Sequence, residues 1–78
     1  MKSDSKVSNS KSVLVKINGE IRLIAQSASI LNLLEIFKIN KDRVVIELNK
    51  EILIKDKFES TIIKENDELE IVTFVGGG

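Results

Sequence analysis

The chain contains no cysteine and no histidine among its 78 residues. Without cysteine it has no disulfide, no thiolate nucleophile and no cysteine-based metal site. Without histidine it lacks the usual general base near neutral pH and the commonest metal ligand. We therefore expect a protein that is not an enzyme, with no catalytic residue, no metal site and no bound cofactor of its own.

An excess of charge and a long apolar run are lacking as well. Twelve Lys and Arg residues balance twelve Asp and Glu residues, whereas nucleic-acid-binding domains usually carry a basic excess or stripe. No stretch approaches the roughly eighteen apolar residues of a membrane span. We expect neither nucleic acid nor membrane as a partner, and a location in the cytoplasm, or in the plastid stroma if the source is a plastid.

What remains is the composition of one small globular domain. Hydrophobic residues make up 42% of the chain and charged residues 31%, and so short a chain has room for one thin core. Residues 1–12 are rich in Ser and Lys and nearly free of apolar side chains, which predicts a flexible N-terminal leader. We place the folded domain at residues 13–75 and a flexible glycine tail at residues 76–78.

The first patterned stretch, residues 13–25, predicts a β-hairpin. Apolar residues alternate with polar ones, and one face of the first strand consists of Val13, Val15 and Ile17. Asn18-Gly19 is the strongest short hairpin signal because both residues tolerate positive φ. In the returning strand we expect an inward face made of Ile21, Leu23 and Ala25.

An amphipathic helix is predicted after the hairpin, in "ILNLLEIFK". Its apolar residues recur at i, i+3, i+4 and i+7, forming one stripe of Ile30, Leu33, Leu34 and Phe37. Ser27 and Ser29 are both candidate N-caps. Lys38 is expected in the last helical turn, where its charge would complement the helix dipole, and Asn40 is expected to end the helix.

The second half of the chain predicts further extended segments. Residues 43–49 alternate, with an inward face of Val44, Ile46 and Leu48. A turn at Asn49-Lys50 leads to a short extended piece that contains Ile52 and Ile54. An irregular segment at residues 55–63 is expected to be anchored by Phe58 and Ile62. A turn centred on Asn66-Asp67 then precedes a last strand whose inward residues are Leu69 and Ile71.

The element order is therefore β-β-α-β-(short β)-β, without an internal repeat. Such an order predicts an α+β fold in which a mixed sheet of four to five strands packs on one main helix. The first and last strands would lie side by side, which is the ubiquitin-like β-grasp arrangement.

Four segments in this order carry a resemblance to a known family: "NGE" (residues 18–20), "LLE" (33–35), "VIELNKEIL" (45–53) and "ENDELEIVTFVGGG" (65–78). Residues 13–78 thereby resemble the ThiS family of sulfur-carrier proteins, which serve the formation of the thiamine thiazole. The family usually has Gly where this chain has Asn66. Asn is the next best residue at positive φ, so we expect the turn to form.

The resemblance implies a function for the glycine tail. In that family a ThiF-like adenylating enzyme joins the terminal carboxylate to AMP from Mg-ATP. Sulfur then replaces the AMP, and thiazole synthase uses the resulting thiocarboxylate. By resemblance the sulfur would be carried at Gly78, with Gly77 beside it, and the protein would be a co-substrate. ATP and Mg²⁺ would belong to the activating partner.

The chemistry of the tail agrees with this role. An α-carboxyl group has a pKa near ~3.5 and is ionised at neutral pH, but a carboxylate is a poor acyl donor until it is activated. An activating site closed against water admits only a thin strand, and glycine has no Cβ to obstruct its entry.

The outward face of the last strand predicts a docking surface. If Leu69 and Ile71 point inward, Val72 and Phe74 point outward, and Val45 on the neighbouring antiparallel strand joins them. Exposed apolar clusters often mark interaction sites. We expect a partner-docking patch of Val45, Val72 and Phe74, with Gly76 at its junction with the tail.

Other functions remain open at this point. The sulfur carrier of molybdopterin synthesis shares the fold and the Gly-Gly end, but it often has Pro before the tail and a longer helix-to-strand connection. A carrier that thiolates tRNA is usually longer. From a different class, a β-grasp interaction module would bind partners through its sheet and have an inert tail.

Overall fold

The protein is described from a computed structural model, and the description covers residues 11–75. Its strands are β1 (Ser12–Ile17), β2 (Glu20–Ala25), β3 (Val44–Leu48), β4 (Glu51–Leu53) and β5 (Glu68–Thr73). One α-helix, α2 (Ile30–Ile36), and two short 3₁₀ turns, η1 (Lys41–Arg43) and η2 (Lys55–Lys57), complete the elements. The predictions for residues 1–10 and 76–78 lie outside the described residues.

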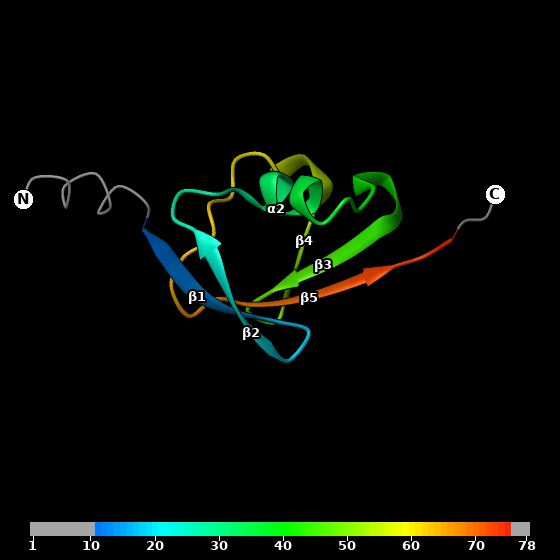
Figure 1. Cartoon of the computed structure of the whole chain (residues 1–78). Coiled ribbons are helices and arrows are strands. Elements are labelled where there is room, and N and C mark those ends of the chain that lie inside the picture. Colours follow the sequence, from blue (N-terminus) through cyan, green and yellow to red (C-terminus); the bar gives the residue numbers. More distant parts are fainter. Residues whose placement is uncertain (1–10, 76–78) are drawn as a thin grey trace, which may run out of the picture.

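The predicted β-grasp arrangement is confirmed. The strands form one five-stranded sheet in the order β2-β1-β5-β3-β4, and α2 lies across one face of that sheet (Figure 1). β1 pairs with β5 in parallel, and the other neighbouring strands pair antiparallel. The last strand of the chain is therefore the middle strand of the sheet.

The core lies between the sheet and α2. It is aliphatic apart from Phe58, and its most deeply buried side chains are Ile30, Leu33, Leu34, Ile46, Ile63, Leu69 and Val15. The predicted inward residues of β1, β3 and β5 all face this core, although Leu48 is only partly buried.

The predicted inward face of β2 is wrong. Ile21 and Leu23 are 63% and 68% exposed and Ala25 is exposed, whereas Ile24 is buried. The cause is the register of the hairpin: the two-residue turn sets Glu20 opposite Ile17, and residues directly opposite share a face. The inward positions of β2 are therefore Glu20, Arg22 and Ile24.

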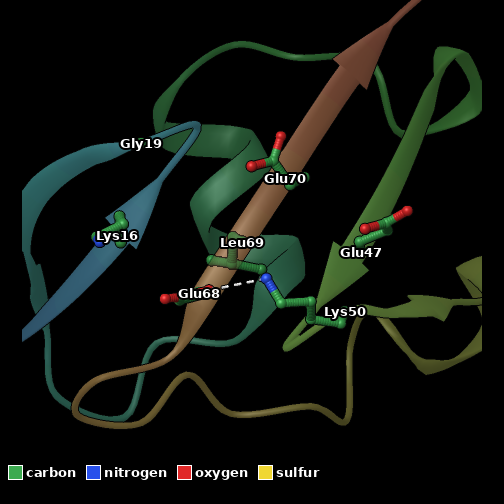
Figure 2. A pocket seen from close by; sticks show the side chains of 7 residues that line it. All are labelled: Lys16, Gly19, Glu47, Lys50, Glu68, Leu69 and Glu70. Atoms are coloured by element: carbon green, nitrogen blue, oxygen red, sulfur yellow. Dashed lines mark ion pairs between the residues drawn. The ribbon is translucent and has the colours of Figure 1, made fainter.

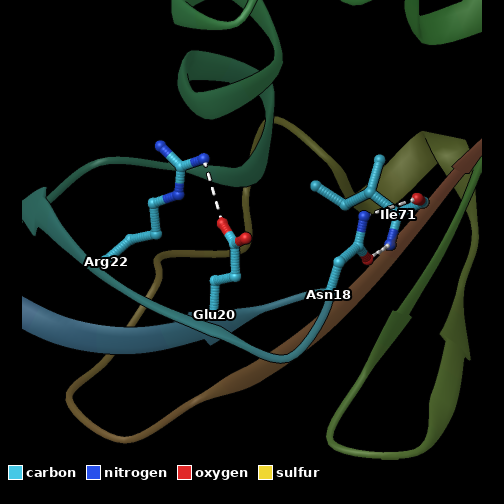
Figure 3. A network of polar contacts seen from close by, with 4 residues as sticks. All are labelled: Asn18, Glu20, Arg22 and Ile71. Carbon is cyan, nitrogen blue, oxygen red and sulfur yellow. Dashed lines mark hydrogen bonds and ion pairs between the residues drawn. The ribbon is translucent and has the colours of Figure 1, made fainter.

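Arg22 occupies its inward position without burying its charge. Its guanidinium lies over the ring of Phe37, 5.4 Å from the centroid, within the range of a cation–π contact. The same group forms an ion pair with Glu20 at 3.5 Å (Figure 3). A polar side chain of β2 thereby contacts Phe37 at the end of α2. The alternation pattern did not predict this contact.

Of the two predicted N-caps of α2, Ser29 is the one used. Its hydroxyl accepts a hydrogen bond from the backbone N–H of Asn32 at 3.0 Å, and its own N–H donates to Asn32 Oδ1 at 3.0 Å. This reciprocal pair is a capping box. Ser27 instead takes a positive φ in the preceding turn.

The prediction that Lys38 lies in the last helical turn is wrong. Ile36 is the last helical residue, Phe37 is the C-cap, and Lys38 follows with φ +60°. The N–H of Lys38 donates to Glu35 O at 3.1 Å and that of Ile39 to Leu34 O at 2.8 Å. This pattern is a Schellman motif, which places Lys38 in the left-handed conformation usually taken by glycine.

Two further assignments differ from prediction. Phe58 is buried as expected, but the second anchor of this segment is Ile63 and not Ile62, which is 44% exposed. A β-bridge between Ile62 and Ser29 sets this phase. Asn40 does not end the helix but caps η1, its Oδ1 accepting a hydrogen bond from the N–H of Asp42 at 2.8 Å.

The predicted turns at Asn49-Lys50 and Asn66 are confirmed. Asn49, Lys50 and Asn66 take φ values of +52°, +74° and +71°. Asn66 also ties its turn to the hairpin, because its N–H donates to Leu14 O at 2.7 Å. Asn therefore replaces Gly here in the conformation that the turn requires.

Asn18 holds β5 against the first hairpin (Figure 3). Its side-chain amide donates to Ile71 O at 3.1 Å, and its Oδ1 accepts a hydrogen bond from Ile71 N–H at 2.7 Å. The pairing of β1 with β5 ends at Ile17 and Leu69. Beyond it, the Asn18 side chain pairs both backbone groups of Ile71.

Replacing Asn18 by Gly is expected to lower the free energy of unfolding by about 1–3 kcal/mol, because it leaves two partly buried backbone groups without their partners. Glycine accepts the +51° φ of this position, so backbone strain does not enter. Urea denaturation measures the change.

Asn66→Gly is the matched control. Asn66 also has a positive φ, and its side chain makes none of the hydrogen bonds found within residues 11–75. We expect this variant to be as stable as the native protein or slightly more stable. Equal stability of Asn18→Gly and Asn66→Gly would contradict the role given to the Asn18 amide.

Candidate functional site

β5 leads the chain out of the sheet towards the glycine tail. Thr73 is its last residue, and one further backbone bond, from Phe74 N–H to Arg43 O at 3.0 Å, continues the alignment with β3. Val75 is 92% exposed. The predicted sulfur-carrying residues Gly77 and Gly78, and the predicted docking residue Gly76, lie outside the described residues. The structure therefore describes the base of the tail, here residues 72–75.

The three other predicted docking residues lie together on the sheet face turned away from α2. Val45 and Val72 are directly paired between β3 and β5. Phe74 follows two residues later, just past the end of β5, where the alternation of the strand directs its side chain to the same side. Their exposed fractions are 43%, 58% and 49%. Whether they bind a partner stays a prediction, but their grouping beside the base of the tail is a feature of the fold.

Two residues that the sequence reasoning did not assign to this surface extend it. Ile52 on β4 is paired with Glu47 and is 65% exposed. Ile54 is 57% exposed, and continuing the register of β3 and β4 by one pair places it opposite Val45. We use the term apolar patch for these five residues: Val45, Ile52, Ile54, Val72 and Phe74. In the sequence, the two isoleucines of the short extended segment were the signal that could have indicated their place on this surface.

Along β3 and β5, the apolar patch is followed on its side away from the tail by charged residues, which Figure 2 shows. Glu47 and Glu70 are directly paired on β3 and β5, and both point away from α2. Like charges in such a pair are destabilising. Further along, Lys16 is paired with Glu68, and Lys50 Nζ lies 3.8 Å from Glu68 Oε1. The cavity among these side chains has a volume of only about 80 Å³, so it suits no ligand of substrate size.

On the helix side, the base of the tail forms one wall of a groove. This groove has a volume of about 590 Å³ and is lined by Lys38, Ile39, Asn40, Arg43, Thr73, Phe74 and Val75. Its residues come from two segments, residues 38–43 between α2 and β3 and residues 73–75 at the end of β5, which are far apart in the sequence. We call it the basic groove, because its only charged lining residues are Lys38 and Arg43.

The carboxylate next to the basic groove is already paired. Asp42 accepts a hydrogen bond from Lys55 Nζ at 2.6 Å, and this bond holds the pKa of the Asp42 carboxyl below its usual 3.8. The same bond raises the pKa of Lys55 above its usual 10.5. Asp42 is thereby directed to the η2 segment and does not form an ion pair with its neighbours Lys41 and Arg43 within the described residues.

Within residues 11–75 no group of three or more acidic side chains is placed to hold a metal ion. No helix in this part of the chain has the length and apolar character needed to cross a membrane. The arrangement is an exposed strand end between an apolar patch and a basic groove.

The Asp42–Lys55 pair predicts a pH dependence. A lowered carboxyl pKa gives a contribution to stability that is present above pH ~3.9 and is lost as the pH falls through the folded-state pKa. The raised pKa of Lys55 gives one that is present below its unfolded value and is lost as the pH rises through the folded value. The pair therefore favours the folded state between these two limits.

An NMR titration of the Asp42 carboxyl carbon measures this directly. We expect a midpoint below 3.8 in the native protein and a return towards the ordinary value in Lys55→Gln. Lys57→Gln, a change of the same charge on the same 3₁₀ turn, is the control and should leave the midpoint in place. The assignment is wrong if both variants titrate like the native protein.

Comparison with known proteins relates this arrangement to one family. The family model described as "ThiS family" matches residues 9–78. The sulfur carrier protein ThiS of Bacillus subtilis is 32% identical over 66 residues, which are 83% of this chain and 100% of that protein. An uncharacterized protein named ycf40 from Porphyra purpurea is 38% identical over 68 residues, 87% of this chain and 96% of the relative.

A longer relative is a thiazole synthase of Paramagnetospirillum magneticum. It is 37% identical over 62 residues, which are 80% of this chain but only 19% of that protein. Among solved structures, the crystal structure of the thiamine biosynthesis protein ThiS from Geobacter metallireducens has a TM-score of 0.72 and 32% identity, and the match covers 85% of this chain and 100% of that one. The β-grasp fold is therefore shared with a solved ThiS structure, and the chain belongs to the ThiS family of sulfur carriers.

Proposed function

We propose that this protein carries sulfur as a thiocarboxylate on Gly78 and donates it to thiazole synthase. The observation that carries the proposal is the family match, which extends through Gly78. Within the described residues, the chain leaves β5 and reaches Val75, which is 92% exposed. Its partners would be a ThiF-like adenylating enzyme and thiazole synthase. The chain itself acts as a protein co-substrate.

The proposed chemistry takes place at the terminal carboxylate. A carboxylate oxygen attacks the α-phosphorus of ATP, and pyrophosphate leaves with the electron pair of the broken P–O bond. A sulfur nucleophile then attacks the acyl carbon, and AMP leaves. Activation divides a difficult substitution into two easier steps. The adenylating partner supplies Mg²⁺ and the enclosed site, and this chain supplies a narrow acyl group at the end of a rigid domain.

The relative from Paramagnetospirillum magneticum supports the thiazole branch. Its match to this chain occupies a small part of a protein named thiazole synthase. In that organism, a segment similar to this protein belongs to the same polypeptide chain that is named thiazole synthase. Proteins that are joined in one organism often act together as separate chains in another, so we assign thiazole synthase as the acceptor here.

The test is intact-protein mass spectrometry after incubation with ATP, a sulfide source and the adenylating enzyme. We expect a mass increase equal to the exchange of one oxygen for one sulfur, located at Gly78 by fragmentation. A variant lacking Gly77 and Gly78 is the control and should not react. An unchanged mass, with the enzyme active on its own carrier, would contradict the proposal, and reaction only with a molybdopterin-type enzyme would reassign the pathway.

The apolar patch is proposed to dock the adenylating enzyme. Replacing Phe74 by Asp puts a charge into the surface beside the tail and is expected to weaken binding by about tenfold or more, as for other central interface residues. Because Phe74 is half exposed, the free energy of unfolding should change by less than about 0.5 kcal/mol. Surface plasmon resonance and urea denaturation give the two values.

Ile21→Asp is the matched control for this variant. Ile21 is 63% exposed and is an outward residue of β2, so the same charge is added to an apolar surface far from the tail in the sheet order. We expect native affinity for this variant. An equal effect of the two substitutions would show that the apolar patch has no special role.

A further inference from the structure

The basic groove lies at the point where a partner must approach the tail. Residues 76–78 span at most about 11 Å beyond Val75 even when fully extended, at about 3.3–3.6 Å per residue. A partner that holds Gly78 in an enclosed site therefore brings the entrance of that site close to Phe74 and Val75. These two residues form one wall of the basic groove, so the groove faces the rim of the entrance.

The cations of the groove have no carboxylate partner in the described part of the chain. Three ion pairs form within residues 11–75, and none involves Lys38 or Arg43 of the groove, or Lys41 between them in the sequence. Asp42, which directly precedes Arg43 in the sequence, is hydrogen-bonded to Lys55. Lys38, Lys41 and Arg43 are all exposed. A surface with this excess of one charge favours a partner surface of the opposite charge.

The two sides of the tail differ in charge. On the sheet face turned away from α2, the apolar patch is followed by the paired carboxylates Glu47 and Glu70 (Figure 2). On the helix side the neighbouring charges are Lys38 and Arg43. A partner that binds the tail in one orientation can distinguish these two sides by their charge. If both sides were uncharged, charge could not set the orientation. The groove therefore contributes to the orientation in which the tail enters.

We propose that the basic groove is a docking site for carboxylate side chains that line the entrance of the tail-accepting site on thiazole synthase. This proposal rests on the proposed function and adds to it the chemistry of the partner surface. Lys38 and Arg43 form ion pairs with acidic residues of the partner while the apolar patch contacts a second part of the same rim. The pairs form at the edge of the interface, where charges act mainly on the association rate and its dependence on salt.

The backbone conformation at Lys38 allows its charge to be removed without loss of stability. With φ +60°, Lys38 takes a conformation in which glycine is more stable than a residue with a Cβ. Lys38→Gly therefore removes the charge and raises the thermal unfolding midpoint. Any loss of affinity in this variant cannot come from loss of folding. Arg43→Gln removes the second charge and leaves intact the backbone carbonyl that accepts the bond from Phe74.

Lys50→Gly is the matched control. Lys50 is also a lysine with a positive φ, +74°, but it lies in the β3–β4 turn beside Glu68, at the end of β5 away from the tail (Figure 2). The substitution removes one positive charge, as Lys38→Gly does, and is likewise expected to raise the unfolding midpoint. It should leave affinity for the partner unchanged.

The experiment measures binding of these variants to thiazole synthase by stopped-flow at several salt concentrations. We expect Lys38→Gly combined with Arg43→Gln to bind about three- to tenfold more weakly, the range of one or two exposed ion pairs. The loss should lie mainly in the association rate and should shrink as salt is added. Lys50→Gly should bind like the native protein.

The possible results separate this inference from the proposed function. If native protein binds thiazole synthase and the double variant binds equally well at all salt concentrations, the basic groove is not a docking site and the proposal is overturned. An equal loss in Lys50→Gly would also overturn it, because it would indicate a response to total charge. If native protein does not bind thiazole synthase at all, the proposed function is what fails.

Discussion

The pairing of β5 on both sides is the constraint on which the rest of the structure depends. β5 lies between β1 and β3, so its backbone links the two antiparallel hairpins into one sheet. Two turn asparagines, one from each hairpin, strengthen this link. Asn18 pairs both backbone groups of Ile71. Asn49 accepts a hydrogen bond from Glu68 N–H at 2.9 Å and donates one to Asp67 at 3.0 Å.

These contacts also fix the position from which the tail leaves the domain. With Leu69 and Ile71 held in the core, the alternation of the strand directs Val72 and Phe74 to the opposite face. The carboxylates of Glu47 and Glu70 remain side by side there although like charges repel. For stability alone, two opposite charges at these positions would be more favourable than two carboxylates.

Features encoded by neighbouring residues could be predicted from the sequence. The Asn18-Gly19 turn, the helix stripe and the inward faces of β1, β3 and β5 follow from local patterns and were confirmed. The inward face of β2 could not be predicted from its own residues, because "EIRLIA" has more apolar side chains in the outward phase. Its orientation is set by the register with β1, and Arg22 fills an inward position by lying over Phe37. Likewise, the sequence does not show which of Ile62 and Ile63 is buried, because the bridge between Ser29 and Ile62 decides it.

The parts of the candidate site also differ in how far they could be predicted from the sequence. Val45, Val72 and Phe74 could be grouped from the sequence because two alternating strands predict a common face. Ile52 and Ile54 join them only once β4 is aligned with β3. The basic groove was missed altogether, since Lys38 and Arg43 meet Phe74 and Val75 through tertiary packing across about thirty residues of sequence. A helix end and a strand end have to be placed before such a groove exists.

We propose that partners recognise the base of the tail and leave the β1–β2 edge free. The most direct measurement is NMR of isotope-labelled protein titrated with thiazole synthase, followed through backbone amide shifts and line broadening. We expect changes at Val45, Val72 and Phe74 and at Lys38 and Arg43, with little change at Ile21 and Leu23. Changes concentrated on β2, with the base of the tail unaffected, would contradict it.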